Sequence, residues 1–449
     1  MTRSSGVATM PAVYERYLDG LRRSQFASPE RLAATQHGLL ERLARHAHEY
    51  VPHYRARLAG LFKDGEFRRD AWSEVPVITR PEVQAQFGEL QAQTEPAEAG
   101  AAVEGSTAGS SGSPLAFRQS HLALIASRCQ WERMLEVHRV DTAAHLATIR
   151  IDRLAPYPQG RETTGWNFAN AESRHSCLHV GTPIAEQTEW LLRCAPKYLM
   201  TYPSNAAALA LQIQSLGAKL PLSGVLTFGE HTAEEQRELI TREFGCRIFD
   251  SYGATEVGFI AFECPAGGGY HLASESVLAE ITDEDGGPLP AGTLGRVVLT
   301  ALYNYAMPFI RYAIGDYAVA AEGPCGCGRT LPRLAGIAGR SRNVFTFADG
   351  SQQSPWGWRS AFVPLIAATQ MQIVQTTIDK IEIRYVPAPG GAPVDPVLIE
   401  EAGRRRIHPS VVVLAIAVDE IPRLPSGKIE DCISLVTSSL WPIAPRPSG

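Results

Sequence analysis

The sequence predicts an α/β protein with a large N-terminal α/β domain that includes a β subdomain, and a small C-terminal α+β domain. Three observations support this fold class. Short apolar runs alternate with helical patterns in the middle of the chain. Past about residue 269, strand patterns follow one another with turn signals between them. From about residue 341 onward a further α/β unit follows, and 449 residues are enough for two or three domains.

The N-terminal part, to about residue 80, has helical patterns. Ser28 followed by Pro29 is typical of a helix start, with a capping hydroxyl and then proline in the first turn. Apolar residues then recur at helical spacing, at Leu32, Leu39, Leu40, Leu43 and Ala47. We expect a second helix from about residue 121 to 138, with Leu124, Trp131 and Leu135 on one face.

Three strand-then-loop patterns occur in the middle of the chain: KYLMTYPSN at 197–205, GVLTFGE at 224–230 and RIFDSYGATE at 247–256. We expect loops after Met200, Phe228 and Asp250 to open at one edge of a sheet, where α/β proteins usually bind ligands. Between the second and third patterns, Thr232 and Glu235 predict a capping box at the start of a helix.

The residues after about 269 predict antiparallel strands, and we place a β subdomain at about 262–335. The turn signal Asp285-Gly286-Gly287-Pro288 lies within it. Near the C-terminus, VVVLAIAV at 411–418 is far too short to span a bilayer, so we interpret it as a buried strand.

Composition excludes several classes of function. The formal net charge is −5, so the chain offers no large positive field for nucleic acid. We interpret the basic cluster Arg404 to Arg406 as a solvated helix face. The N-terminal residues have no continuous apolar core of the secretory kind. We therefore expect a cytoplasmic enzyme with neither a nucleic-acid nor a membrane partner, and its oligomeric state stays open.

The stretch STAGSSGSP, from Ser106 to Pro114, is rich in glycine and hydroxyl residues. Glycines let several backbone N–H groups turn toward one anion, and hydroxyls add donors, so the stretch suits a phosphate loop. Taken alone, it is equally compatible with a flexible linker. It lacks the Gly-Lys-Ser/Thr ending of an ordinary P-loop NTPase, which excludes that class.

Five segments in order resemble the motifs of the adenylate-forming enzymes, the acyl-CoA synthetase superfamily. They are the loop at 106–114, DSYGATE at 250–256, IRYAIGD at 310–316, GRSRN at 339–343 and PSGK at 425–428. Within the superfamily, HAHEYVPHYRARL at 46–58 and the stretch from Phe228 to Glu256 resemble the phenylacetate–CoA ligase branch, which includes CapK-like proteins. The resemblance covers nearly the whole chain.

This resemblance implies an N-terminal adenylation domain at 1–341 and a mobile C-terminal lid domain at 342–449, which rotates about residues 339–343. It implies an ATP-dependent, AMP-forming ligase that activates a carboxylic acid as an acyl-adenylate, releases pyrophosphate and then transfers the acyl group, most simply to coenzyme A. Two alternative hypotheses are an amide or ester synthetase and an adenylation enzyme that loads a carrier protein. A degenerate nucleotide-binding protein is the non-enzyme alternative.

The resemblance also assigns roles to residues. Lys428 would bridge the substrate carboxylate and the α-phosphate, Thr255 would donate to the α-phosphate, and Glu256 would hold Mg²⁺. Tyr252 would stack on adenine, Asp316 would accept from the ribose hydroxyls, and Arg340 would assist near the ribose. The phosphate loop would act through Thr107, Gly109, Ser110, Ser111 and Gly112. The remaining nucleotide-binding residues would be Gly229, Glu230, His231, Asp250, Ser251 and Gly253.

The sequence departs from the family pattern at three places. Ser113 stands where the phosphate loop often carries a lysine, which shifts phosphate binding toward backbone donors. Arg342-Asn343 stands in place of the usual hinge residues, so the hinge role of Arg342 stays open. His231 follows Gly229-Glu230 where many relatives have proline, and we expect it to pack or hydrogen-bond near the nucleotide.

The acyl pocket is expected between the helix that carries Trp131 and the loops near Tyr202, Phe228, Tyr252 and Gly253. Its aromatic residues favour an aryl or other compact apolar acid, although aromatic side chains also simply fill cores.

Four residues with metal-ligand chemistry lie in two glycine-rich segments, CPAGGGYH at 264–271 and CGCGR at 325–329. Cys264, His271, Cys325 and Cys327 form a set that suits a tetrahedral zinc ion, and some relatives look similar here. The alternative is four unrelated loop residues. We expect a structural zinc and no catalytic role for it. The other cysteines, Cys129, Cys177, Cys194, Cys246 and Cys432, are interpreted as core residues.

Overall fold

The computed structural model describes residues 10–107, 114–340, 345–353, 355, 358–388, 390–424 and 427–436. Within these residues one long sheet forms the centre of the molecule. It has 13 strands, in the order β14-β15-β16-β17-β13-β12-β11-β10-β9-β6-β8-β7, with β3 paired to β16. The C-terminal part of the described chain forms a separate four-stranded sheet, in the order β22-β21-β20-β23.

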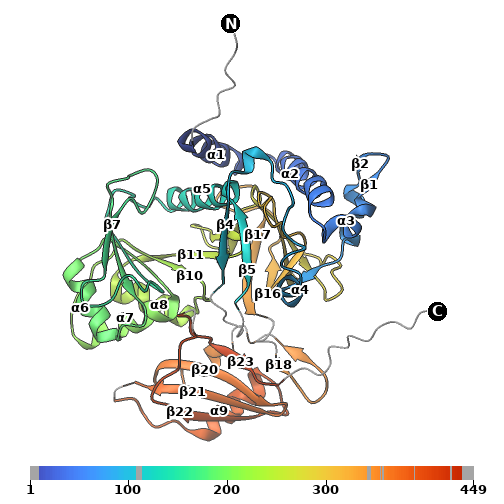
Figure 1. The fold of residues 1–449 in the computed structure, drawn as a ribbon. Coiled ribbons are helices and arrows are strands. Elements are labelled where there is room, and N and C mark those ends of the chain that lie inside the picture. The colour runs from blue at the N-terminus through green and yellow to red at the C-terminus, as the bar shows by residue number, and fades with distance from the viewer. Residues whose placement is uncertain are drawn as a thin grey trace.

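The parallel part of the long sheet runs from β8 to β11. Its strands are β6 (Leu146–Arg150), β8 (Arg174–His179), β9 (Tyr198–Thr201), β10 (Gly224–Phe228) and β11 (Arg247–Ala254), with β7 (Arg161–Thr164) antiparallel at the edge. The helices α6 (Ile184–Cys194), α7 (Pro203–Ser215) and α8 (Glu234–Phe244) lie along its outer face, at the left of Figure 1. Their apolar residues and those of the strands share one buried core.

The antiparallel part continues from β11 without a break in hydrogen bonding. Its strands are β12 (Gly258–Glu263), β13 (Tyr270–Leu272), β14 (Val277–Thr282), β15 (Leu294–Ala301), β16 (Tyr312–Ala320) and β17 (Arg333–Arg340). The expected antiparallel strands therefore form. They extend the parallel sheet and do not make a separate sheet.

The N-terminal residues are helical, as the sequence predicts. The helices are α1 (Met10–Ser24), α2 (Pro29–Tyr50), α3 (Tyr54–Arg57), α4 (Arg80–Ala85) and α5 (His121–Val137). Ser28 caps α2 by accepting from the Arg31 N–H at 3.3 Å. Short strands join them: β1 (Phe62–Lys63), β2 (Glu66–Phe67), β3 (Ile78–Thr79), β4 (Ala102–Ser106) and β5 (Ala116–Ser120). The hairpin of β4 and β5 carries the phosphate-loop stretch between its strands.

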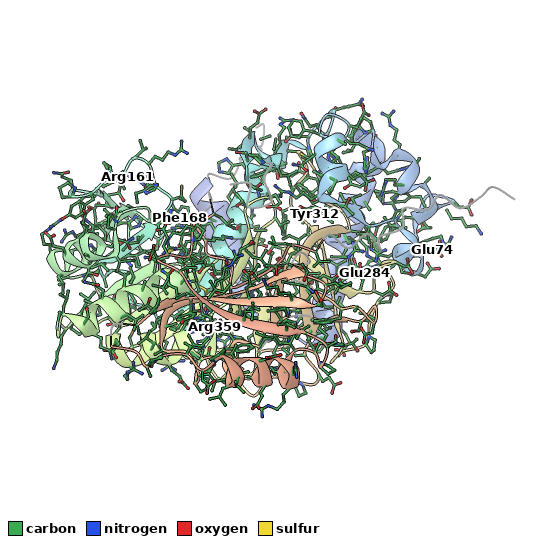
Figure 2. All side chains as sticks on the ribbon, turned by 90° about the horizontal axis from the view of Figure 1, so that it is seen from below. Glu74, Arg161, Phe168, Glu284, Tyr312 and Arg359 are labelled. Atoms are coloured by element: carbon green, nitrogen blue, oxygen red, sulfur yellow. The ribbon has the colours of Figure 1, made fainter. Side chains whose placement is uncertain are left out.

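The C-terminal unit has its own core, at the bottom of Figure 1. It consists of β18 (Phe345–Thr346), β19 (Gln352–Gln353), β20 (Ala368–Thr377), β21 (Lys380–Pro387), α9 (Pro396–Arg406), β22 (Val412–Ala417) and β23 (Cys432–Ser434). Figure 2, a view from below, has this sheet in front of the N-terminal part. Arg404 to Arg406 are exposed on α9, as expected.

Two local predictions are corrected in the middle of the chain. The third strand does not end at Asp250: β11 continues to Ala254 because Ser251 to Ala254 pair with β12 in an antiparallel hairpin. The capping box at Thr232 and Glu235 is one residue out of place. Helix α8 begins at Glu234, and the Gln236 side chain accepts from the Ala233 N–H at 3.1 Å. An alanine cannot supply the usual capping oxygen, which is why the sequence pattern misled.

The apolar run at 411–418 is also different from the prediction of a buried strand. Strand β22 lies at the edge of the C-terminal sheet, and Val412 and Leu414 are exposed while Val411 and Val413 are buried. Helix α9 packs on one face of β22 and buries Val413 there, whereas Val412 and Leu414 on the other face are exposed. Because successive side chains of a strand point to opposite faces, a run that is apolar at every position leaves alternate side chains exposed. Among the described residues no helix is both long and apolar enough to cross a membrane.

The close packing of α9 on β22 leads to a stability prediction. A Cβ added at Gly403 would lie 2.2 Å from Val413 Cγ2, whereas one at Gly38 in the interior of α2 would meet no atom outside its own helix within 4 Å. We expect Gly403→Ala to lower the free energy of unfolding by about 1–3 kcal/mol through overpacking. The matched Gly38→Ala should leave it unchanged or raise it by up to about 1 kcal/mol. Urea unfolding of both variants measures this, and equal effects would contradict the packing described.

Candidate active site

A cavity of about 1260 Å³ opens where the carboxyl ends of the parallel strands meet the C-terminal segment. Most of the residues singled out from the sequence line it: Thr107, Trp131, Tyr202, Phe228, Gly229, Glu230, His231, Asp250, Ser251, Tyr252, Gly253, Thr255, Glu256, Asp316 and Lys428. Gly109, Ser110, Ser111 and Gly112, and with them Ser113, Arg342 and Asn343, lie outside the described residues, as does the Arg340 side chain. The chain therefore brings together residues that are more than 300 positions apart in sequence, from Thr107 to Lys428.

Tyr252 and Asp316 reach the cavity from two different strands. Tyr252 lies on β11 and Asp316 on β16, and the tyrosine hydroxyl donates to Asp316 Oδ2 at 2.7 Å. An aromatic ring beside a carboxylate offers a stacking face and a hydrogen-bond acceptor in one place, which suits a nucleoside. Their adjacency agrees with the roles expected of them, and those roles remain predictions.

Glu256 lies in the turn between β11 and β12, with only 5% of its surface exposed. The Tyr312 hydroxyl donates to Glu256 Oε1 at 3.2 Å. Burial raises the pKa of Tyr312, and the Glu256 charge raises it further, so the hydroxyl stays a donor at neutral pH. A carboxylate oriented by a neighbouring hydroxyl and facing a cavity is the kind of ligand that Mg²⁺ binds.

Asp250 is buried below the cavity, and its carboxylate is held by the protein. The Thr227 hydroxyl donates to Oδ1 at 2.7 Å and the Tyr270 hydroxyl to Oδ2 at 2.6 Å. Burial raises the pKa of Asp250. These contacts join β10, β11 and β13, so the residue fixes the strands that carry Ser251 and Tyr252.

Lys428 approaches from the C-terminal segment and packs on the loop after β10. A Cβ at Gly229 would lie 2.9 Å from Lys428 Cε and 3.1 Å from Nζ, so a side chain here would force the end of the lysine to shift. Gly229 also has φ +79°, a conformation that favours glycine. The backbone at Gly229 therefore favours glycine, and the lysine lies directly beside it.

Glu230, the residue after Gly229, binds the C-terminal segment that carries Lys428. Its Oε1 accepts from the Ile429 N–H at 2.6 Å, and its Oε2 accepts from the Ser204 N–H at 3.0 Å. Arg423 makes a second tie, since its Nη2 donates to Asn205 Oδ1 at 3.0 Å. Sequence reasoning placed Glu230 near the nucleotide and missed both its bond to Ile429 and the role of Arg423. An arginine five residues before Lys428 was the available signal.

The described ends of the phosphate-loop stretch are well anchored. Thr107 Oγ1 accepts from the Leu115 N–H at 3.0 Å and from Arg80 Nη2 at 2.9 Å. Arg80 lines the same cavity. Sequence reasoning did not find it, because it belongs to no motif and lies 27 residues before Thr107.

The part of the cavity where the sequence places the acyl pocket is more polar than the sequence led us to expect. Tyr202 and Phe228 lie together, with ring centroids 4.9 Å apart, and Trp131 lines the same space. Arg128, Arg150 and His175 line the cavity as well. Burial, aided by Arg150 and other nearby positive groups, lowers the pKa of His175 to about 4, so its ring is neutral at pH 7.

Cys264, His271, Cys325 and Cys327 meet as the sequence predicts. Their ligand atoms all lie within 4.8 Å of one another. Cys264 Sγ lies 3.4 Å from Cys325 Sγ, and His271 Nε2 lies 3.2 Å from Cys327 Sγ. Zinc–sulfur bonds of about 2.3 Å place tetrahedral ligand atoms roughly 3.5–3.8 Å apart, so this donor set and spacing fit zinc.

Comparisons with known proteins agree with the fold and with the motifs. The chain is 28% identical to a phenylacetate-coenzyme A ligase from Thermus thermophilus over 329 residues, 70% of this chain and 72% of that one. It is 30% identical to the Escherichia coli enzyme of the same name over 36% of this chain and 39% of that one. No family model matches.

Among solved structures, 2-hydroxyisobutyryl-CoA ligase in the postadenylation state, with 2-HIB-AMP, matches with a TM-score of 0.74 at 20% identity. The match covers 92% of this chain and 91% of that one. The chain has the adenylate-forming ligase fold. The fold predicted from five ordered motifs is therefore confirmed, as is the resemblance to the phenylacetate–CoA ligases.

The same solved ligase in its thioesterification state, with 2-HIB-AMP and CoA, matches over the same share of both chains with a TM-score of only 0.57. The described arrangement of the two parts of this chain is thus closer to the postadenylation arrangement.

The contact of Glu230 with Ile429 leads to a pH prediction. Desolvation raises the pKa of Glu230 to about 7, from an ordinary value of 4.5. We call the state in which the C-terminal segment contacts Glu230 the docked state. Glu230 binds a proton more tightly in this state than when it is solvated, so docking is favoured as the pH falls through 7. When the pH is lowered from 8.5 to 6, we expect the radius of gyration measured by small-angle X-ray scattering to decrease. Glu230→Gln, which cannot ionise, should lose this pH dependence. The opposite trend, with the radius growing at low pH, would show that the desolvation argument is wrong.

Proposed function

We propose that this chain is an ATP-dependent, AMP-forming ligase that converts a carboxylic acid to an acyl-adenylate with release of pyrophosphate and passes the acyl group to coenzyme A. One observation carries the proposal: a single cavity is lined by Lys428, Thr255, Glu256 and Asp316. These are the residue types that carboxylate activation on a nucleotide requires. The sequence relatives named as phenylacetate-coenzyme A ligases support the same reaction class.

The first half-reaction joins two anions, and the site supplies positive charge and donors to allow it. A carboxylate oxygen of the acid bonds to the α-phosphorus, and the bond from that phosphorus to the bridging oxygen breaks as pyrophosphate leaves. In our proposal the Lys428 ammonium lies between the carboxylate and the α-phosphate, and Thr255 donates to the α-phosphate. Such preorganised charge acts on the transition state more than on the separated reactants.

Glu256 would hold Mg²⁺, which neutralises the crowded phosphates when it is bound. The hydrogen bond from the Tyr312 hydroxyl orients the Glu256 carboxylate toward the proposed position of Mg²⁺. Tyr252 would stack on the adenine and Asp316 would accept from the ribose hydroxyls, with Arg340 near the ribose. We also propose that Thr107 and the glycine and serine residues after it bind the β- and γ-phosphates.

The second half-reaction requires Lys428 to leave. In this step the coenzyme A sulfur bonds to the acyl carbon, the bond from that carbon to the adenylate oxygen breaks as AMP leaves, and the thiol proton is released to solvent. The segment that carries Lys428 lies over the site in the docked state. We propose that residues 342–449 rotate as a lid about residues 339–343. The better match to the postadenylation than to the thioesterification state of the solved ligase supports two arrangements of this kind. Rotation has to break the bonds of Glu230 to Ile429 and of Arg423 to Asn205.

Coenzyme A is the favoured acyl acceptor because the curated and solved relatives reported above are CoA ligases. Formation of product with an amine or a carrier protein, independent of coenzyme A, would select the alternative acceptors. For the acid we propose an aryl or other compact molecule, bound beside Trp131, Tyr202 and Phe228. We propose a cytoplasmic location, in keeping with the sequence.

The decisive test is pyrophosphate release with Mg·ATP across a panel of aryl and small aliphatic acids, with and without coenzyme A. We expect release that depends on the acid, and a further rise in turnover when coenzyme A is present. Lys428→Ala should lower the adenylation rate by about 10²–10³-fold, and Glu256→Gln by a comparable factor, since each removes charge stabilisation from the transition state.

Lys219→Ala, which removes an exposed lysine away from the cavity, is the matched control and should act like the wild type. Binding of ATP without release on any acid would instead favour the degenerate nucleotide-binding protein.

We also propose that Cys264, His271, Cys325 and Cys327 bind one structural zinc ion. The ion would join the β12–β13 hairpin to the loop between β16 and β17, and four protein ligands would leave no position for a catalytic water. Metal analysis should find about one zinc per chain.

Cys327→Ser should lower the zinc content and the melting temperature, with little change in ATP affinity, since the cluster does not line the cavity. Full zinc content in this variant would exclude Cys327 as a ligand. Cys246→Ser, which changes a buried cysteine elsewhere, controls for loss of a core thiol.

A further inference from the structure

The phosphate loop of this chain has Ser113 where a lysine often stands, yet three or more negative charges of ATP must be bound beside it. Residues 108–113 lie outside the described residues, but both ends of the loop are described. At these ends one short helix, α4, makes both contacts. Arg80 Nη2 donates to Thr107 Oγ1 at 2.9 Å, and Gln84 Nε2 donates to the Pro114 carbonyl at 3.2 Å.

Arg80 is held in place by strand pairing. Directly before it, β3 pairs in parallel with β16: Ile78 lies opposite Tyr312, and the Ile78 N–H donates to the Arg311 carbonyl at 3.0 Å. Strand β16 also carries Asp316. The arginine is therefore fixed to the same strand as the residue expected at the ribose.

The Arg80 guanidinium also reaches the carboxylate expected to hold magnesium, through one hydroxyl. It lies close enough to the Tyr312 hydroxyl to lower the pKa of that tyrosine, against the larger effect of burial. The same Tyr312 hydroxyl donates to Glu256 Oε1. Arg80 thus lies between Thr107 of the phosphate loop and Tyr312 beside Glu256, and it lines the cavity from there.

Several other cations that line the cavity are paired or lie at another part of it. Arg237 pairs with Glu263 at 3.1 Å and Arg359 with Asp431 at 3.6 Å. Arg150 lies near His175. Lys428 lies against Gly229. Arg128 is paired with Glu132 at 3.3 Å and lines the cavity with Trp131, where the acyl pocket is expected. An arginine stays charged at any physiological pH and offers a planar fork of donors that matches two phosphate oxygens.

We propose that Arg80 binds the β- and γ-phosphates of ATP, and then the pyrophosphate product, in place of a loop lysine. This rests on the proposed function, since it assigns one further binding residue to that same site. It replaces the expectation that backbone donors alone compensate for Ser113.

The test uses the full-length protein and nucleotide binding, so that it needs no knowledge of the acid. Calorimetric titration with Mg·ATP and, separately, with AMP compares a ligand that has the β- and γ-phosphates with one that lacks them. Arg80→Ala should weaken ATP binding about 10- to 100-fold, the range expected for loss of a charged hydrogen-bond donor, and leave AMP binding unchanged. Arg80→Lys should recover part of the ATP affinity.

A second-site variant makes the test sharper. Lysine introduced at the loop, as Ser113→Lys in the Arg80→Ala background, should restore ATP affinity if the missing element is a positive charge at the phosphates. Arg57→Ala controls for the position of α4: Arg57 pairs with Glu82 of that helix at 2.7 Å but does not line the cavity. This control should bind ATP like the wild type.

Each outcome decides a separate point. Equal loss of ATP and AMP affinity in Arg80→Ala would overturn the proposal, because it would mean a general disturbance of the site. Unchanged ATP affinity would overturn it too. If the wild type binds ATP and Arg80→Ala does not, but no acid supports pyrophosphate release, the assignment of Arg80 holds while the proposed ligase function fails.

Discussion

Strand β11 is the element on which the candidate site depends. On one side it pairs in parallel with β10, and on the other it forms an antiparallel hairpin with β12. The parallel partner places its carboxyl end at the edge of the sheet where ligands bind in α/β proteins. The antiparallel partner extends the strand beyond Asp250, so that Tyr252 reaches Asp316 and the turn presents Thr255 and Glu256. One strand thus joins the nucleotide side of the cavity to the parallel sheet.

The C-terminal segment docks through strong individual hydrogen bonds, and docking also has a desolvation cost. Glu230 and Arg423 form good hydrogen bonds across the interface, but burial disfavours the charged form of each, as their shifted pKa values indicate. When charges leave water, the desolvation cost offsets much of the gain from pairing. A docked state held in this way is only modestly favoured, which is compatible with the proposed rotation of residues 342–449.

The sequence was most informative where several residues of fixed chemistry stand in one short segment. Tyr252, Thr255 and Glu256 are adjacent in the chain, so one strand end brings them into the cavity together. The four zinc-ligand candidates could be found because thiols and an imidazole at turn spacing are rare in a chain of this kind. Arg80 and Arg423 could not be found, since arginines are common and their roles come from β3 pairing with β16 and from α7 lying under the docked segment. The edge position of β22 depends on sheet order, which periodicity does not encode.

The contact between Arg80 and Thr107 connects two elements of the candidate site. The hairpin of β4 and β5 carries Thr107 at the start of the proposed phosphate loop, and α4 carries the cation beside it. Because one hydrogen bond joins the two side chains, a mutation that removes the arginine also removes an anchor of Thr107. If Arg80 binds phosphate as proposed, the charge offered to the phosphates and the anchoring of this strand end depend on one side chain, so the two properties would change together in evolution.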